Sequence, residues 1–74
     1  MSYASDMEFV YNYTDCIDID YTDVIKTKQS FNYLVNNLRA DNLISQRSAD
    51  NMYLSVDKEN KQAMIVCGCY RLKL

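Results

Sequence analysis

The chain has 74 residues, of which 49% are hydrophobic and 24% charged, and its formal net charge is −2 at pH 7. This balance is typical of a folded domain and excludes a disordered chain, in which hydrophobicity is lower and net charge higher. The sequence contains no apolar run of about 18 residues, which excludes a membrane-spanning helix, and we expect a single domain over residues 1–74.

The cysteines and the first residues bear on the cellular compartment. Three cysteines are an odd number and too few for a disulfide scaffold, so we expect reduced thiols in a reducing compartment. The stretch MSYASDMEFV lacks both the basic start and the apolar body of a signal peptide. A cytoplasmic location is therefore expected.

Charge is distributed unevenly along the chain. Residues 1–25 hold six acidic and no basic residues, and residues 26–74 hold eight basic and four acidic residues. The first part thus carries −6 and the second +4. This division predicts an electrically two-sided molecule, unless the fold brings the two parts together and neutralises them.

Apolar and polar residues alternate from Met7 to Tyr21. The odd positions carry mainly aromatic and β-branched side chains, a period of two that is typical of a strand with one buried face. The pattern breaks at residues 12–15. We therefore expect a hairpin that pairs residues 7–12 with residues 16–22, although one long strand fits nearly as well.

The beginning of this stretch also admits a helix. Ser5 and Glu8 match a capping box, in which each side chain bonds the backbone N–H of the other residue. In this rival interpretation a helix begins at Ser5. The aromatic content of the stretch favours the strands.

The segment KQSFNYLVNNLR, residues 28–39, predicts an amphipathic helix. Its apolar residues recur at i, i+3, i+4 and i+7 and so form one stripe that faces the core: Phe31, Leu34, Val35 and Leu38. Lys28, Asn32 and Asn36 then face water. Thr27 is the expected N-cap, because its hydroxyl can accept a backbone N–H of the first turn.

The tripeptide ADN occurs at residues 40–42 and again at 49–51, each time before an apolar residue. We expect Asp41 to cap a short second helix that extends through Gln46, and Asp50 to lie in the turn before the next strand. The repeat is too short to indicate a duplication.

The last part of the chain predicts a hairpin. MYLSVD (52–57) and AMIVCGCYRLKL (63–74) are strand-like, and a polar turn around KENKQ separates them. Residues 63–69 are apolar almost throughout, as in a central strand covered on both faces, with Gly68 as a local bulge. The elements together predict an α+β fold: a four-stranded, mainly antiparallel sheet in the order ββαββ, with one or two helices packed on one face.

Several kinds of chemistry are missing from the sequence. Without histidine, Ser-His and Cys-His nucleophile arrangements are excluded, and the usual general base near neutral pH is absent. A single glycine excludes glycine-rich phosphate loops. We therefore expect no catalytic residues, no cofactor and no enzymatic activity.

Two pairs of residues are candidate metal ligands. On a strand, Cys67 and Cys69 would point to the same side about 7 Å apart, but two thiols fall short of the four ligands of structural zinc, even with Cys16 recruited. A metal ion shared by the cysteines of two copies is an alternative. The favoured interpretation is that these cysteines are small buried side chains of the core. Asp18 and Asp20 have the same spacing and could hold Mg²⁺, yet nothing else in the sequence indicates a nucleotide site. No metal site is expected.

The acidic residues of the first part are interpreted as a recognition surface. A row of carboxylates suits a basic groove on a protein partner, since opposite potentials steer association. Tyrosine is enriched in interface hot spots, and the chain has seven. The residues expected to bind the partner are Asp15, Asp18, Asp20, Asp23, Tyr11, Tyr13 and Tyr21.

A protein that normally binds DNA or RNA would also bind such a surface, because nucleic-acid phosphates present a comparable row of negative charge. The expected function is thus non-enzymatic. In character the chain resembles the small inhibitors that phages and mobile elements direct against host nucleic-acid-processing or defence proteins. The resemblance implies a nucleic-acid mimic that blocks such a protein.

The alternative function uses the basic remainder of the chain. A small dimeric regulator or structural subunit would pair through its sheet edge or its tyrosines and touch nucleic acid with its basic C-terminal portion. The basic residues concerned are Lys26, Lys28, Arg39, Lys58, Lys61, Arg71 and Lys73. The acidic sequence pI of about 4.8 disfavours direct nucleic-acid binding.

Overall fold

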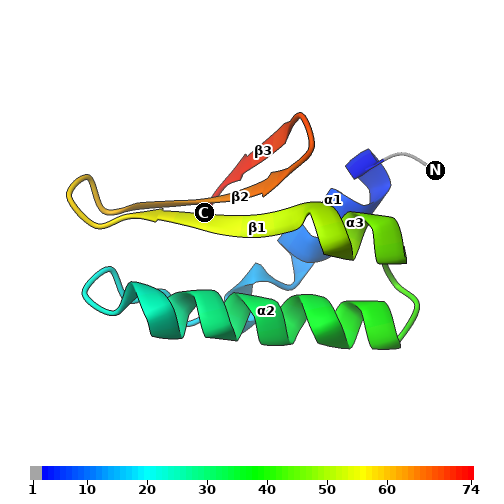
Figure 1. The fold of residues 1–74 in the computed structure, drawn as a ribbon, viewed down its shortest axis with the longest axis horizontal. Helices are drawn as coiled ribbons and strands as arrows, with labels where there is room; N and C mark the ends of the chain where they lie inside the picture. The colour runs from blue at the N-terminus through cyan, green and yellow to red at the C-terminus, as the bar shows by residue number, and fades with distance from the viewer. Residues whose placement is uncertain (1–2) are drawn as a thin grey trace.

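Helices precede strands in the computed structural model, which describes residues 3–74 (Figure 1). The elements are α1 (Tyr3–Asn12), the 3₁₀ helix η1 (Thr14–Cys16), α2 (Val24–Ala40), α3 (Gln46–Asn51), β1 (Met52–Asp57), β2 (Gln62–Cys67) and β3 (Tyr70–Lys73). The α+β class and the antiparallel sheet are confirmed. The four-stranded ββαββ order is wrong, since the described residues form three strands, all after the helices.

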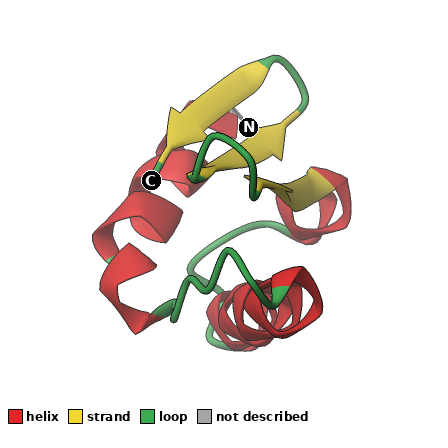
Figure 2. Ribbon diagram, turned by 90° about the vertical axis from the view of Figure 1, so that its left-hand side faces the viewer, coloured by secondary structure: helices red, strands yellow, loops and turns green. Residues whose placement is uncertain are grey.

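The sheet has the order β1-β2-β3, and both pairings are antiparallel. Ile65 of β2 lies opposite Leu54 of β1 and Leu72 of β3, so the central strand is the one predicted from its apolar run. Helices α1 and α2 lie on the same side of the sheet (Figure 2). α1 packs against β3 and α2 against β1, and the core fills the space between them.

Residues 7–12 belong to a helix, so the strand predicted for them is wrong and the rival helical interpretation is confirmed. The helix begins at Tyr3, two residues before the expected start. Its core face has helical spacing, with Met7 and Val10 buried and Tyr3 partly buried. A strand would have turned Phe9 and Tyr11 inward with Met7, whereas they are 41% and 57% exposed. Period two and period 3.6 share too many apolar positions here to be separated by sequence alone.

Residues 16–22 form no strand either, although the alternation correctly predicted which side chains face the core. Ile17 has extended backbone angles and is buried, and Ile19 packs against the core. Asp18 and Asp20 between them are exposed. After η1 the chain passes through residues 17–20 without a strand partner and then turns at residues 21–22.

Helix α2 begins earlier than predicted, because Asp23 and not Thr27 is its N-cap. The Asp23 carboxylate accepts the Lys26 N–H at 3.1 Å. The Thr27 side chain is instead fully buried, and its hydroxyl accepts the Asp20 N–H at 3.0 Å and lies 3.0 Å from the carbonyl oxygens of Asp20 and Asp23. Thr27 therefore ties the preceding segment to the helix.

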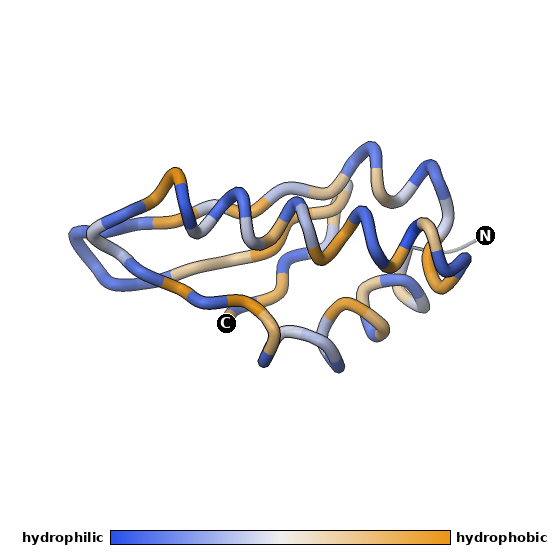
Figure 3. The backbone as a smooth tube through the Cα atoms, turned by 90° about the horizontal axis from the view of Figure 1, so that it is seen from below, coloured by the Kyte–Doolittle hydropathy of each residue, from blue (hydrophilic) through white to orange (hydrophobic). Residues whose placement is uncertain are grey.

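The predicted apolar stripe of α2 is confirmed, since its four members are all buried: Phe31, Leu34, Val35 and Leu38. In Figure 3, hydrophobic and hydrophilic stretches alternate within the turns of the helix. This stripe is the largest contribution of one helix to the core.

The first ADN tripeptide ends α2 and does not start the next helix, so the cap predicted at Asp41 is wrong. Asn42 adopts the left-handed region at φ 59°, its N–H bonds the Arg39 carbonyl, and the Leu43 N–H bonds the Leu38 carbonyl at 2.9 Å. These two bonds define a Schellman motif, which closes a helix. In the second tripeptide, Asp50 lies inside α3 and not in a turn.

A buried carboxylate joins α1 to the start of α3. Asp6 is 5% exposed, and its Oδ2 accepts the Ser45 N–H at 3.1 Å and the Ser45 hydroxyl at 3.0 Å. Ser45 in turn caps α3, because its Oγ accepts the Ser48 N–H. Burial raises the pKa of Asp6, but the Ser48 and Ser45 hydroxyls and the Ser45 amide outweigh it, so the net pKa is lowered.

Gly68 forms the turn between β2 and β3 and not a bulge within a strand. Its φ of +60° is a conformation that other residues rarely adopt. A Cβ here would lie 3.1 Å from the Tyr3 ring, so α1 packs directly on this turn. Strand β2 consequently ends at Cys67.

We predict that Thr27→Val, which keeps the shape of the side chain, lowers the free energy of unfolding by about 1 to 3 kcal/mol, because the part-buried Asp20 N–H loses its acceptor. Urea unfolding measures the change. Thr27→Ser, which keeps the hydroxyl, is the control for bonding. A valine variant as stable as the wild type would show that this hydroxyl does not hold the segment.

We predict that Asp6→Asn destabilises the protein at pH 7 by about 1 to 3 kcal/mol, because a charged acceptor of two hydrogen bonds is lost. The folded-state pKa of Asp6 is lowered, so its contribution is complete above the unfolded pKa of about 3.9 and disappears as pH falls through the folded value. Urea unfolding of both proteins at pH 7 and below pH 3 tests this. A stability difference that does not shrink in acid would contradict it.

Candidate protein-binding surface

The predicted binding residues lie mainly in the segment that joins α1 to α2, residues 13–23, here called the acidic connector. Asp15 lies in η1 and is exposed, and Asp18 and Asp20 are exposed on the irregular stretch that follows η1. Asp23 is half-buried at the start of α2. The structure therefore does not place these carboxylates along one face of a regular strand.

Two of the four connector aspartates have structural roles. Asp20 Oδ1 accepts the Thr22 N–H at 2.9 Å and the Thr22 hydroxyl at 2.6 Å, and these bonds lower the pKa of Asp20. Asp23 caps α2. Both residues are therefore needed for the path of the chain.

Asp15 and Asp18 are the connector carboxylates without a structural role among residues 3–74. Neither forms a salt bridge with a lysine or arginine of this part of the chain. Lys73 of β3 lines a shallow hollow together with Asp15, Tyr11 and Ile19. Apart from that neighbour, these two carboxylates are available to a partner.

The three predicted tyrosines do not form one cluster. Tyr21 is half-buried and packs against the core. Tyr11 faces β3, where it lines hollows with Tyr70, Leu72 and Lys73. Tyr13 lies on the other side of the connector, against α2. The tyrosine-rich surface is thus divided in two.

The side that holds Tyr13 is a groove between the connector and α2, here called the connector groove. Its volume is about 290 Å³, and its lining residues are Tyr13, Cys16, Ser30, Tyr33, Leu34, Asn37, Leu38, Asp41 and Leu43. Sequence reasoning missed the α2 wall. The spacing of Ser30, Tyr33 and Asn37 at i, i+3 and i+7 could have indicated it, since these residues share one helix face.

The fold brings basic and acidic residues together at one end of the molecule. Figures 1 and 2 place the turn between β1 and β2 at the same end as the start of α2. This end holds four lysines and four acidic residues: Lys26, Lys28, Lys58, Lys61, Asp20, Asp23, Asp57 and Glu59. The division of charge along the sequence is therefore partly neutralised in space.

The three arginines make contacts within the chain. Arg39 donates to the Gln46 side chain at 2.9 Å, Arg71 donates to the Gly68 carbonyl at 2.9 Å, and Arg47 lies 5.8 Å from the centre of the Tyr3 ring. Arginine is the residue best suited to bidentate phosphate contacts. These internal contacts weaken the interpretation of the C-terminal portion as a nucleic-acid-binding surface.

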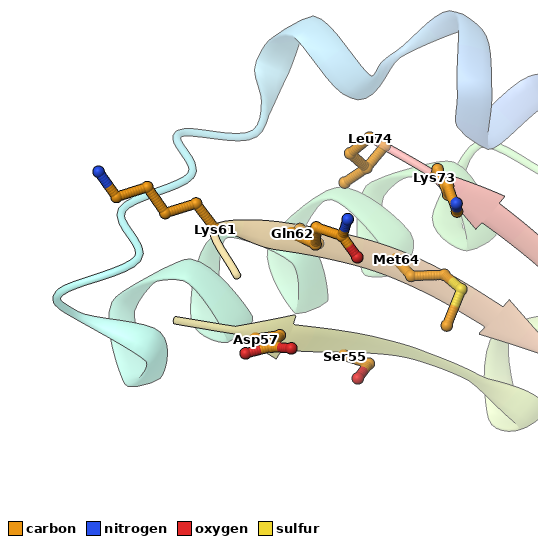
Figure 4. A pocket seen from close by; sticks show the side chains of 8 residues that line it. Ser55, Asp57, Lys61, Gln62, Met64, Lys73 and Leu74 are labelled. Atoms are coloured by element: carbon orange, nitrogen blue, oxygen red, sulfur yellow. The ribbon is translucent and has the colours of Figure 1, made fainter. Parts of the chain in front are cut away.

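Another hollow of about 290 Å³ lies over the strands near the C-terminal end of β3. Its lining includes Lys61, Lys73 and Asp57, and Figure 4 shows that the two lysine side chains do not converge. A bound anion requires converging donors, so this hollow is not an anion site of the kind that the alternative function would use.

The cysteines do not form a metal site. Cys67 is fully buried, with its Sγ 3.7 Å from the Ser48 carbonyl oxygen, whereas Cys69 is exposed in the turn and Cys16 is exposed on η1. Because the strand ends at Cys67, the predicted same-side placement of Cys67 and Cys69 is wrong. Within residues 3–74, no three acidic, cysteine or histidine residues are grouped to hold a metal ion.

Comparison with known proteins adds no functional assignment. No protein-family model, curated protein or solved structure matches the chain. Over residues 3–74, no helix combines the length and the apolarity required to cross a lipid bilayer.

We predict that two thiols of the folded protein react with a disulfide reagent and that the third reacts only on unfolding. Cys16 and Cys69 are exposed, whereas burial, with a smaller effect from the Asp6 charge, raises the pKa of Cys67 and disfavours the reactive thiolate. Thiol titration with and without denaturant measures this. Fast reaction of all three thiols in the native protein would contradict the packing of Cys67.

Proposed function

We propose that the chain is a non-enzymatic binding protein whose acidic connector occupies a basic surface of a protein partner. The single observation that carries this proposal is the exposure of Asp15 and Asp18 without a salt bridge to the described lysines and arginines. Exposed carboxylates of one sign attract a basic surface at a distance and accelerate association.

The exposed aromatic residues beside these carboxylates supply contact area. Tyr11 in the last turn of α1 and Tyr13 at the start of the connector are 57% and 42% exposed. A tyrosine brings an apolar ring and a hydroxyl to an interface at small entropic cost. In this proposal the carboxylates accelerate association, and the buried surface of the tyrosines stabilises the complex.

A nucleic-acid-processing or defence protein is the kind of partner proposed, because such proteins present basic surfaces to phosphates. Occupying that surface would block its normal ligand, as an inhibitor does. Since Asp20 and Asp23 serve the fold, the proposed mimicry of phosphate rests on Asp15 and Asp18 more than on a row of four carboxylates. Cytoplasmic location and dimerisation stay predictions.

We predict that the double variant Asp15→Lys and Asp18→Lys loses a basic partner that the wild type captures from extracts of its native cell. The matched control is Asp50→Lys with Glu59→Lys, two exposed positions outside the connector, and both variants change the net charge from −2 to +2. Affinity capture with mass spectrometry identifies the partner.

Association rates of the purified pair, measured over a range of salt concentrations, then test the mechanism. We expect the connector variant to associate at least about tenfold more slowly at low salt, with a flatter salt dependence, and the control to remain close to wild type. Equal slowing in the two variants would assign the effect to net charge and not to the connector. Filter binding to oligonucleotides at low salt tests the alternative function.

A further inference from the structure

The connector groove has the size and the surface of a site for one apolar side chain. A cavity of about 150 Å³ suffices to bind benzene, and the groove measures about 290 Å³. Leu34, Leu38 and Leu43 contribute to its lining, and the rings of Tyr13 and Tyr33 belong to its walls. Tyr33 is 72% exposed, a large aromatic surface for a side chain on a helix.

The charged residues around the groove indicate the sign of the charge that its partner should carry. Among the described residues that line it, Asp41 is acidic and none is basic. Asp15 directly precedes the lining residue Cys16 in the chain, but it lines the hollow beside Lys73 on the other side of the connector, so Asp41 is the carboxylate at the groove itself. The nearest cation along this side of α2 is Lys26, one turn before Ser30, or about 6 Å along the helix axis. An apolar floor with an acidic margin complements an apolar side chain between basic residues.

We propose that the connector groove receives one aromatic or aliphatic side chain from a lysine- or arginine-rich segment of the protein partner. This inference rests on the proposed function and specifies how the partner is held. The carboxylates of the connector attract the basic residues of the segment, and the groove buries the apolar one. A second copy of the chain is the poorer occupant, because it would bring two acidic connectors together.

The apolar area buried by the inserted side chain determines how much affinity the groove should add. Transfer of a phenylalanine ring from water to a partly open groove corresponds to about a tenfold gain in affinity over alanine. This gain in affinity requires that the groove be empty. A larger side chain of the protein itself that fills the groove should therefore abolish the difference in affinity between phenylalanine and alanine.

The probe is a short synthetic peptide of lysines and glycines with one central phenylalanine, and its partner probe has alanine in place of the phenylalanine. Amide resonances of the ¹⁵N-labelled protein are followed during titration with each peptide. We expect the phenylalanine peptide to shift the resonances of Tyr13, Tyr33 and Asn37 and to bind about tenfold more tightly than the alanine peptide.

Two variants at adjacent positions of α2 test the groove. Asn37 lines the groove and Asn36 does not, and both are exposed. Asn37→Trp should reduce the affinity for the phenylalanine peptide to that for the alanine peptide, whereas Asn36→Trp should preserve the tenfold difference. If the Asn37 variant does not fold, attaching N-phenylmaleimide to Cys16 in a Cys69→Ser protein fills the same groove.

The outcomes separate this inference from the proposed function. Equal affinity for the two peptides, or equal effects of the Asn36 and Asn37 variants, would overturn the groove assignment. Asp15→Lys with Asp18→Lys would then still weaken both peptides alike if the acidic connector binds basic segments. Binding of neither peptide would overturn both proposals.

Discussion

The contact between Asp6 and Ser45 determines how the first helix sits on the rest of the protein. Removing a carboxylate from water is unfavourable unless its oxygens are hydrogen-bonded, and here the amide and the hydroxyl of one residue provide the bonds. Ser45 also caps α3, which runs directly into β1. Ser45, 39 residues further along the chain than Asp6, thus links the position of α1 to the first strand of the sheet.

The path of the acidic connector follows from this placement and from a second tie at Thr27. α1 ends beside β3 and α2 runs beneath β1, so the connector has to cross between them. Ile17 and Ile19 turn toward the core, and the Thr27 hydroxyl holds the backbone of Asp20. Asp18 is then left on the outer side. Its exposure is a consequence of these anchors and not of strand pairing.

Charge in space differs from charge along the sequence. The start of α2 and the turn after β1 lie at one end, where lysines and carboxylates mix. A partner that approaches this end meets little net charge. Asp15 and Asp18 precede it in the chain, nearer to the beginning of the connector. The connector carboxylates without a structural role, Asp15 and Asp18, are therefore fewer than the six acidic residues of the first part suggested. The proposed binding of a protein partner rests on these two carboxylates.

The sequence by itself determined the elements whose signals are local: the apolar stripe of α2, the antiparallel pairing of β1 with β2, and the inward side chains of residues 17–21. It also determined the absence of histidine chemistry. Only the tertiary structure decided that residues 3–12 form a helix and that Tyr13 lines the same groove as Tyr33. The helix at residues 3–12 depends on residues far away in the sequence. The apolar pattern around Met7 fits both a strand period of two and a helical period of 3.6. The hydrogen bond from Ser45 to Asp6 and the packing of the Tyr3 ring against Gly68 favour the helix.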